Sequence, residues 1–275
     1  MRILVTGAAG MLGTDLVARL AQRHEVTPVD LDVDVTDAAA VTACVDDVRP
    51  DAIVHCAAWT DVDGAEDHVE QAERLNAEAT GIVARAAASA EATLVYPSTD
   101  YVFDGSAGRA YREDDPVAPA SVYGRTKLAG ERAAIEAHPS GTRVARTAWL
   151  YGAAGGNFVD TMRRLGAERD EVSVVDDQEG SPTWTKELSR AIEELLVVPP
   201  GVYHTAGAGS VTWAGLAEAV FELAGIECRV GRITTEDLGR PAPRPANSAL
   251  VSSRPGAPRL RHWREALADY LKETE

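Results

Sequence analysis

Lysine, cysteine and aromatic residues are all scarce in this chain of 275 residues. The only lysines are Lys127, Lys186 and Lys272, so a lysine that falls within a motif is informative. The three cysteines form no CxxC pair, which argues against a disulfide framework or a zinc site and predicts small, buried thiols.

Long hydrophobic runs are also missing. No apolar stretch approaches the ~18 residues of a membrane span, and the apolar start of the chain is interrupted by Gly7, so no signal peptide is expected. The formal net charge of -16 would repel nucleic acid and anionic membranes. We therefore expect a cytoplasmic protein that binds neither nucleic acid nor membrane.

Strand and helix patterns alternate along the first half of the chain. Apolar strands are predicted at 2–6, 25–30, 51–58, 92–98 and 142–152, with helical patterns between them. This alternation predicts an α/β fold with a doubly wound parallel sheet. Beyond residue 150 the pattern loosens. We expect a dinucleotide-binding Rossmann domain over 1–150 and a smaller, mainly substrate-binding lobe over 151–275, with some segments returning to the sheet.

Three glycines follow the first predicted strand and open a helix. Gly7, Gly10 and Gly13 would allow a tight turn, close approach of a pyrophosphate, and packing of helix on strand. Asp30 closes the second strand, where an acid accepts adenosine ribose hydroxyls and disfavours a 2′-phosphate. The sequence therefore predicts a site for NAD(P)H; Asp30 favours NAD(H) over NADP(H), and a nearby Arg would change that preference.

A phenol and an ammonium lie four residues apart on one predicted helix. Tyr123 and Lys127 share a helix face, and the lysine cation is expected to lower the pKa of the phenol. Lysine can also hold the nicotinamide ribose. The alternative is a core tyrosine beside a lysine that reaches out to solvent, but the preceding glycine loop favours a catalytic pair.

The glycine loop and the YxxxK spacing together resemble the extended short-chain dehydrogenase/reductase family. In that family a Ser or Thr at the end of the fourth strand completes the catalytic set, which implies Thr99. Sugar-nucleotide 4,6-dehydratases carry an Asp-Glu pair at this point, and Tyr101 stands at the Glu position here. The 4-epimerases usually carry a Ser-rich run instead.

The phrase "STDYVFDG" at 98–105 is similar to the dTDP-4-dehydrorhamnose reductase family. "AAWTDVDGAE", "VYGRTKLAGE", "RTAWLYG", "DDQEGSPTW" and "RPANSAL" resemble further phrases of that family in the same order, to about residue 250. The resemblance implies NAD(P)H-dependent reduction of the C4 ketone of dTDP-4-dehydro-L-rhamnose to dTDP-L-rhamnose. Another dTDP-4-keto sugar stays open as substrate, as does a non-catalytic role like that of the regulatory subunit of methionine adenosyltransferase. A homodimer is one option for the oligomeric state.

The resemblance also implies a set of site residues. The catalytic residues would be Thr99, Tyr123 and Lys127. The cofactor would be held by Gly7, Gly10, Met11, Leu12, Gly13, Asp30, Asp34, Val35, Ala57, Ala58, Trp59, Thr60, Ser98, Tyr123 and Lys127. The sugar nucleotide would contact Thr99, Asp100, Tyr101, Trp149, Arg244 and Asn247.

Several of these positions have a structural alternative. Asp34 could serve only as a helix cap, and Arg244 only in a salt bridge. Position 59 is often His in the family and is Trp here. Some members use an acid to bind a metal between subunits; Asp15 is the only local candidate, and no metal is predicted. His204 is expected to be a buried structural histidine.

Overall fold

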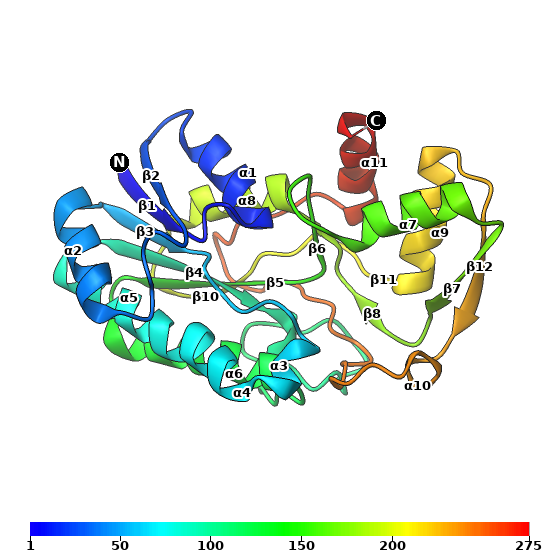
Figure 1. Ribbon diagram of the computed structural model, residues 1–275, viewed down its shortest axis with the longest axis horizontal. Coiled ribbons are helices and arrows are strands. Elements are labelled where there is room, and N and C mark those ends of the chain that lie inside the picture. Colours follow the sequence, from blue (N-terminus) through cyan, green and yellow to red (C-terminus); the bar gives the residue numbers. More distant parts are fainter. Residues whose placement is uncertain (275) are drawn as a thin grey trace.

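Six parallel strands form the central sheet of the computed structural model, which describes residues 1–274 (Figure 1). Their spatial order is β10 (Gly201–His204), β5 (Thr142–Thr147), β4 (Thr93–Thr99), β3 (Ala52–His55), β1 (Arg2–Thr6) and β2 (Glu25–Val29). The order reverses direction between β1 and β3. In open parallel sheets such a reversal creates a crevice at the carboxyl ends of the strands, where ligands bind.

Helices cover both faces of this sheet. In Figure 1, α1 (Met11–Leu20) and α8 (Thr185–Leu195) lie on one face, and α2 (Ala38–Val48), α5 (Ala79–Ser89) and α6 (Val122–Ala137) lie on the other. Within β1, Ile3 and Val5 pack toward α1 and α8, whereas Leu4 packs toward α2 and α5. Burial on both faces explains why the central strands β1 and β3 are nearly continuous apolar runs. The predicted fold class is confirmed.

Short helices lead into α5 and close the end of β4. They are α3 (Gly64–Asp67), α4 (Val69–Glu73), the π-helical turn η1 (Arg74–Glu78) and the 3-10 turn η2 (Asp100–Val102). Asp37 caps α2 by accepting hydrogen bonds from the amides of Ala39 and Ala40, as its position before that helix predicts.

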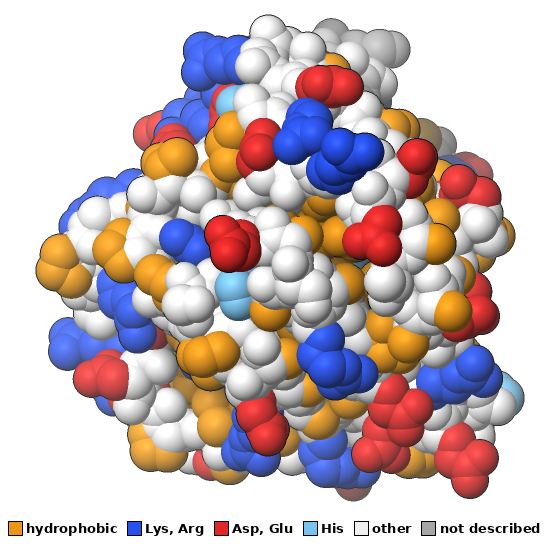
Figure 2. Space-filling model, turned by 90° about the vertical axis from the view of Figure 1, so that its left-hand side faces the viewer, with side chains coloured by type: hydrophobic (Ala, Val, Ile, Leu, Met, Phe, Trp, Pro, Cys, Tyr) orange, Lys and Arg blue, Asp and Glu red, His pale blue; other side chains and the backbone are white. Residues whose placement is uncertain are grey.

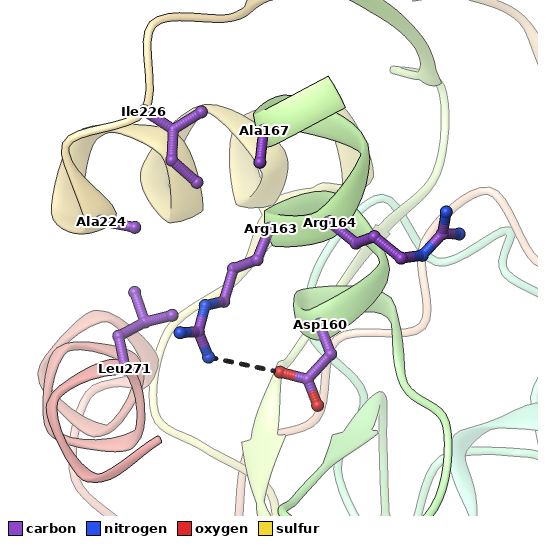
Figure 3. A pocket seen from close by; sticks show the side chains of 7 residues that line it. All are labelled: Asp160, Arg163, Arg164, Ala167, Ala224, Ile226 and Leu271. Atoms are coloured by element: carbon purple, nitrogen blue, oxygen red, sulfur yellow. Dashed lines mark ion pairs between the residues drawn. The ribbon is translucent and has the colours of Figure 1, made fainter. Parts of the chain in front are cut away.

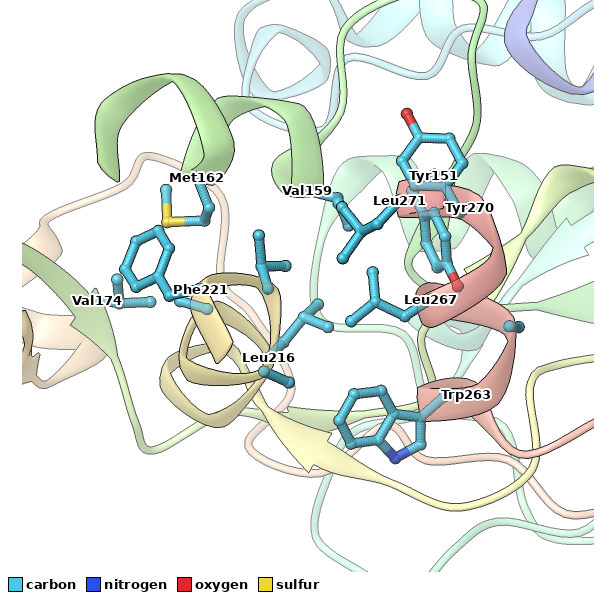
Figure 4. Packing of buried hydrophobic residues seen from close by; sticks show 14 of the residues in the cluster. Tyr151, Val159, Met162, Val174, Leu216, Phe221, Trp263, Leu267, Tyr270 and Leu271 are labelled. Carbon is cyan, nitrogen blue, oxygen red and sulfur yellow. The ribbon is translucent and has the colours of Figure 1, made fainter. Parts of the chain in front are cut away.

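The smaller lobe has a core of its own. Figure 4 shows side chains of α7 (Phe158–Glu168), α9 (Trp213–Ala224) and α11 (Trp263–Glu273) meeting around Leu216 and Leu267. Two-stranded pairs and one short helix complete the lobe: β7 (Glu171–Val175) with β12 (Arg229–Ile233), β8 (Glu179–Gly180) with β11 (Val211–Thr212), β6 (Leu150–Tyr151) with β9 (Thr183–Trp184), and α10 (Thr235–Leu238).

The chain leaves the lobe and returns to the sheet between residues 185 and 204. Helix α8 packs on α1, and β10 adds the last parallel strand beside β5. The connections after β5, before α8 and after β10 therefore link the lobe to the sheet, which places the lobe beside the predicted site.

Charges of both signs are mixed over the surface seen in Figure 2, with apolar atoms between them. No single sign gathers on that face. Among residues 1–274, no helix has the length and apolar character needed to cross a membrane.

Candidate active site

The glycine loop lies between β1 and α1 and packs tightly. Gly7 has a φ of 65°, and a Cβ on it would lie 2.5 Å from the Ala57 nitrogen. A Cβ on Gly13 would lie 2.2 Å from the Gly7 carbonyl oxygen. Both positions therefore require glycine. The first amides of α1 lack partners within the helix, so they form a cradle for phosphate oxygens at its positive end.

Asp30 lies at the end of β2, beside this loop. Its carboxylate accepts a hydrogen bond of 2.8 Å from the Ala9 amide, which ties the strand end to the loop. Asp34 accepts hydrogen bonds from the amide and hydroxyl of Thr36, and these bonds hold the pKa of Asp34 below its usual value. Both carboxylates line the same rim of the cleft.

A cleft of about 840 Å³ runs from this rim along the carboxyl edge of the sheet to the lobe. Its volume suits an extended organic ligand. The lining includes every predicted cofactor residue except Trp59, together with four of the predicted substrate residues, Thr99, Asp100, Tyr101 and Trp149.

Trp59 departs from the expectation because its hydrogen bonds turn it away from the cleft. Its main chain is paired with the Asn76 side chain, and its indole nitrogen donates to the Asp61 carbonyl. The ring packs beside Ala65 and Ala72 instead. The structure therefore places Trp59 behind the cleft wall.

Thr99 and Asp100 end β4 and begin η2. The Thr99 hydroxyl accepts the Tyr101 amide at 3.1 Å and donates to Asp100 Oδ1 at 3.0 Å. Asp100 is 2% exposed, and burial raises its pKa to about 6, against the opposing effect of the Ser248 and Thr99 hydroxyls. Within residues 1–274 its Oδ2 has no hydrogen-bond partner. A buried carboxyl oxygen of this kind suits a ligand hydroxyl.

Helix α6 begins at the cleft and presents the predicted catalytic pair. The Ser121 hydroxyl caps the helix by accepting the Gly124 amide, and Glu66 accepts the Val122 amide at 2.8 Å. A Cβ on Gly124 would lie 2.2 Å from the Tyr101 carbonyl oxygen, so only glycine lets the helix approach η2 this closely. Tyr123 is thereby held against Tyr101, with the rings edge to face at 5.7 Å.

The electrostatics of this pair differ from the expectation. Burial raises the pKa of Tyr123 to about 12, although the Thr99 hydroxyl opposes the rise. Burial also lowers the pKa of Lys127 to about 7. The ammonium donates to the Pro97 carbonyl at 2.8 Å and lies 4.1 Å from the Tyr96 ring centroid, so it is engaged with β4. At neutral pH Tyr123 therefore keeps its proton, which is the form that a proton donor needs.

A buried ion pair lies one turn further along α6. The carboxylate of Glu131 accepts two hydrogen bonds from Arg146, at 2.9 and 2.7 Å, and a third of 2.5 Å from the Ser98 hydroxyl. Ser98 lines the cleft, as expected of a residue on the cofactor side, but it donates its hydroxyl proton to Glu131.

Two tryptophans form the lobe side of the cleft. The rings of Trp149 and Trp213 stack at 3.5 Å with an angle of 4° between their planes. Trp149 has a φ of 47°, and a Cβ on Gly180 would lie 2.3 Å from its ring, so Gly180 makes room for it. The Trp213 indole donates to Gln178, which holds the stack toward the lobe.

The two predicted substrate residues from "RPANSAL" lie outside the cleft lining. Arg244 forms a bidentate ion pair with Asp63, at 2.7 and 3.0 Å, which is the structural alternative. Asn247 donates to Glu179 at 3.1 Å. Tyr101 lies near enough to Arg244 for that charge to act on its phenol, so the ion pair borders the substrate end of the cleft.

The remaining candidates have structural surroundings. His204 is 3% exposed, with Nδ1 directed at the Tyr111 and Val251 carbonyls, and burial lowers its pKa to about 4. It is the buried histidine that was predicted. The cysteines are free within the described chain, and all three are partly rather than fully buried.

Asp15 takes part in a hydrogen bond rather than an acidic cluster: it accepts the Thr185 hydroxyl at 2.5 Å. Residues 1–274 contain no group of three or more His, Cys, Asp or Glu side chains arranged for a metal. A second, smaller cavity of about 440 Å³ lies between α7, α9 and α11, where Arg163 points toward Asp160 (Figure 3). None of its lining residues belongs to the motifs above.

Sequence reasoning missed several residues that shape the site. Asn76, in the π-helical turn, is fully buried and binds both the Trp59 main chain and the Thr126 hydroxyl. Glu131 carried a signal, because it follows Lys127 by one further helical turn on the same face. Arg146 carried a weaker one, because Arg143 is a second basic residue in the same strand. Trp213 carried none.

The parallel sheet and its glycine loop define a Rossmann-type α/β protein. The chain belongs to the family described as RmlD substrate binding domain, whose model matches residues 1–275. The family resemblance read from the motifs is thus confirmed, and the match continues past residue 250 to the end of the chain.

Three relatives show what the chain is similar to. A dTDP-4-dehydrorhamnose reductase of Streptomyces griseus is 47% identical, over 98% of this chain and 92% of its own length. A probable dTDP-4,6-dihydroxy-2-methyloxan-3-one 4-ketoreductase of Streptomyces antibioticus is 46% identical, over 98% and 94%. The crystal structure of dTDP-4-dehydrorhamnose reductase from Bacillus anthracis in complex with NADP has a TM-score of 0.95 at 38% identity, covering 99% of each chain.

Proposed function

We propose that this protein is an NAD(P)H-dependent reductase that converts the C4 ketone of dTDP-4-dehydro-L-rhamnose to the alcohol. The observation that supports it best is the meeting of Thr99, Asp100, Tyr123 and Lys127 in one cleft with a glycine loop built for phosphate. Relatives that cover nearly the whole chain carry the names of such reductases.

Each side chain has a distinct role in this proposal. The Thr99 hydroxyl and the Tyr123 phenol would hold the substrate carbonyl oxygen, and Tyr123 would give its proton to the developing alkoxide. The high pKa of Tyr123, about 12, keeps that proton in place until negative charge develops. Asp100 would accept a sugar hydroxyl. Lys127 would hold the ribose of the nicotinamide nucleotide, which supplies the hydride when bound.

The cleft fits a dinucleotide that carries few charges beyond its pyrophosphate. Asp30 and Asp34 line the adenosine rim, and Lys127 is the single cation among the lining residues of the described chain. A 2′-phosphate at that rim would meet two lining carboxylates, and Arg74 beside Asp34 is engaged with the Thr36 hydroxyl. We therefore expect NADH to be preferred, with Asp30 as the determinant.

A second substrate is favoured by one finding. The S. antibioticus relative, named as a 4-ketoreductase of a different dTDP sugar, is almost as similar as the first. The chemistry at C4 is the same, so the lobe wall formed by Trp149 and Trp213 would decide between the sugars. The substrate-binding role of the lobe over 151–275, the contacts from Arg244 and Asn247, a homodimer and a cytoplasmic location stay predictions.

The test is an assay of NADH and NADPH oxidation with dTDP-4-dehydro-L-rhamnose and a panel of other dTDP-4-keto sugars. We expect turnover with at least one of them and a higher kcat/KM for NADH. Binding of dinucleotide without turnover of any substrate would instead favour a non-catalytic role.

A further inference from the structure

An ion pair and a serine hydroxyl link three elements of the Rossmann domain next to the proposed catalytic residues. Glu131 comes from α6, Arg146 from β5 and Ser98 from β4, and all three are at most 4% exposed. We call Glu131, Arg146 and Ser98 the buried triad. Every hydrogen bond within it is between 2.5 and 2.9 Å.

Stability is a poor explanation for the buried triad. Removing two charges from water costs several kcal/mol per ion, about as much as their attraction returns, and apolar replacements are often neutral or stabilising. Arg146 also leaves its Nη1 without a partner within residues 1–274, and its guanidinium lies 5.2 Å from the Phe103 ring centroid. A costly arrangement at this position points to a role in the chemistry.

The buried triad joins β4 and α6, the two elements that carry the proposed catalytic residues, to β5. Ser98 lies between Pro97, whose carbonyl holds the Lys127 ammonium, and Thr99. Ser98 pairs in register with Arg146 across β4 and β5, and Thr99 pairs with the next residue, Thr147. On α6, Glu131 follows Lys127 by one turn, just as Lys127 follows Tyr123.

We propose that Glu131 is a positioning residue: with Arg146 and Ser98 it fixes Thr99 and Lys127 relative to Tyr123, and its negative charge favours the protonated form of Lys127. This inference rests on the proposed reductase function, because Lys127 must carry charge for that chemistry. Neither the family resemblance nor the relatives assign Glu131 or Arg146 a role.

Few groups other than Glu131 could place a negative charge near the Lys127 ammonium. The titratable groups that face it are Tyr123 and Glu131 on α6, His55 at the end of β3, Cys56 just after that strand, and Tyr96 on β4, with Arg146 of β5 behind Glu131. His55 and Cys56 are neutral near pH 7, because burial lowers the pKa of the first to about 3 and raises that of the second to about 12. Glu131 is thus the carboxylate that opposes the loss of the Lys127 proton.

The experiment is the pH dependence of kcat/KM for wild type and Glu131→Gln, with the best substrate from the panel above. Without the carboxylate, Lys127 loses its proton more easily, so the alkaline limb should move to lower pH by about one unit. At pH values above the alkaline limb, kcat/KM of the variant should be roughly tenfold lower than a variant with an unmoved limb would show, because one pH unit corresponds to a factor of ten in the fraction of protonated enzyme.

Glu193→Gln is the matched control. Glu193 forms an ion pair of 2.6 Å with Arg19 on the opposite face of the sheet, away from the cleft lining. This variant should lose thermal stability yet keep the wild-type pH profile. If Glu131→Gln also keeps the wild-type profile and only lowers Tm, the pair is structural and the inference is wrong. An inactive wild type would instead refute the proposed function.

Glu131→Asp separates charge from geometry and covers the case in which Glu131→Gln does not fold. The shorter carboxylate keeps its charge but cannot reach Arg146 and Ser98 together. We expect kcat to fall severalfold with the alkaline limb unmoved. Full kcat in a folded Glu131→Asp enzyme would overturn the positioning role.

Discussion

The floor of the cleft and the lobe above it bury opposite kinds of chemistry. Beneath the cleft, α6 and β4 enclose Lys127, Glu131 and Asp100, all at most 3% exposed. The lobe encloses aromatic rings, including Phe221 (Figure 4), and no buried Asp, Glu, Lys or Arg lies in it within residues 1–274. Buried charge fixes a geometry at a cost in stability, whereas aromatic packing supplies stability and a shaped apolar wall. We therefore expect substitutions at the floor of the cleft to impair catalysis, and substitutions in the core of the lobe to impair folding.

Substitution of Tyr123 should break catalysis alone. Tyr123→Phe removes the proton donor, so kcat should fall about 10²- to 10⁴-fold, the range of a general acid. Because the ring stays, Tm and dinucleotide binding should match wild type. Steady-state rates, thermal unfolding and quenching of intrinsic fluorescence by the dinucleotide measure the three quantities. Near-normal turnover would remove Tyr123 from the mechanism.

Substitution of Phe221 should destabilise the lobe. Phe221 is 3% exposed and fits against α7 where a Cβ on Gly166 would lie 2.5 Å from its ring. Phe221→Ala should lower the free energy of unfolding by about 3–5 kcal/mol. Denaturant unfolding measures it, with Val197→Ala as the control, since Val197 is 80% exposed and should change little. Equal losses for the two variants would contradict the packing described here.

Trp213 lies where the two regions meet, so its substitution should change substrate affinity with little effect on chemistry. Trp213→Ala removes the ring stacked on Trp149 and should raise KM for the sugar nucleotide about five- to tenfold. The KM for the dinucleotide should stay the same. Trp263→Phe, in the lobe core but outside the cleft lining, is the control for stability. An unchanged sugar KM would exclude Trp213 from the site.

At the adenosine rim we expect a change in dinucleotide preference rather than a loss of activity or stability. Asp30→Asn keeps a side-chain oxygen for the Ala9 amide but removes the negative charge that a 2′-phosphate would meet. The ratio of kcat/KM for NADPH to that for NADH should rise about tenfold. Initial rates with both dinucleotides give the ratio. A ratio equal to that of wild type would mean that Asp30 does not select the dinucleotide.

The sheet region was largely predictable because its signals are local. The glycine spacing after a strand depends only on residues close together in the sequence. The same is true of the pair formed by Tyr123 and Lys127 on one helix face. The lobe was harder, since its strands are mostly two to five residues long and its core joins α7, α9 and α11 across more than 100 residues. Trp213 meets Trp149 only through that packing. The sequence did not show that Arg244 would pair with Asp63, or that Asn76 would bind the main chain of Trp59, because these contacts join segments far apart in the chain.

Transfer of an isotopic label decides whether reduction at C4 is the reaction. Wild-type enzyme would be supplied with dTDP-4-dehydro-L-rhamnose and a reduced nicotinamide dinucleotide deuterated at C4, and the product sugar examined by NMR. We predict one deuterium at the hexose C4 with wild type, and formation of the same labelled product at least about 10²-fold more slowly with Tyr123→Phe. Consumption of neither reactant, or deuterium at another carbon, would contradict the proposed function.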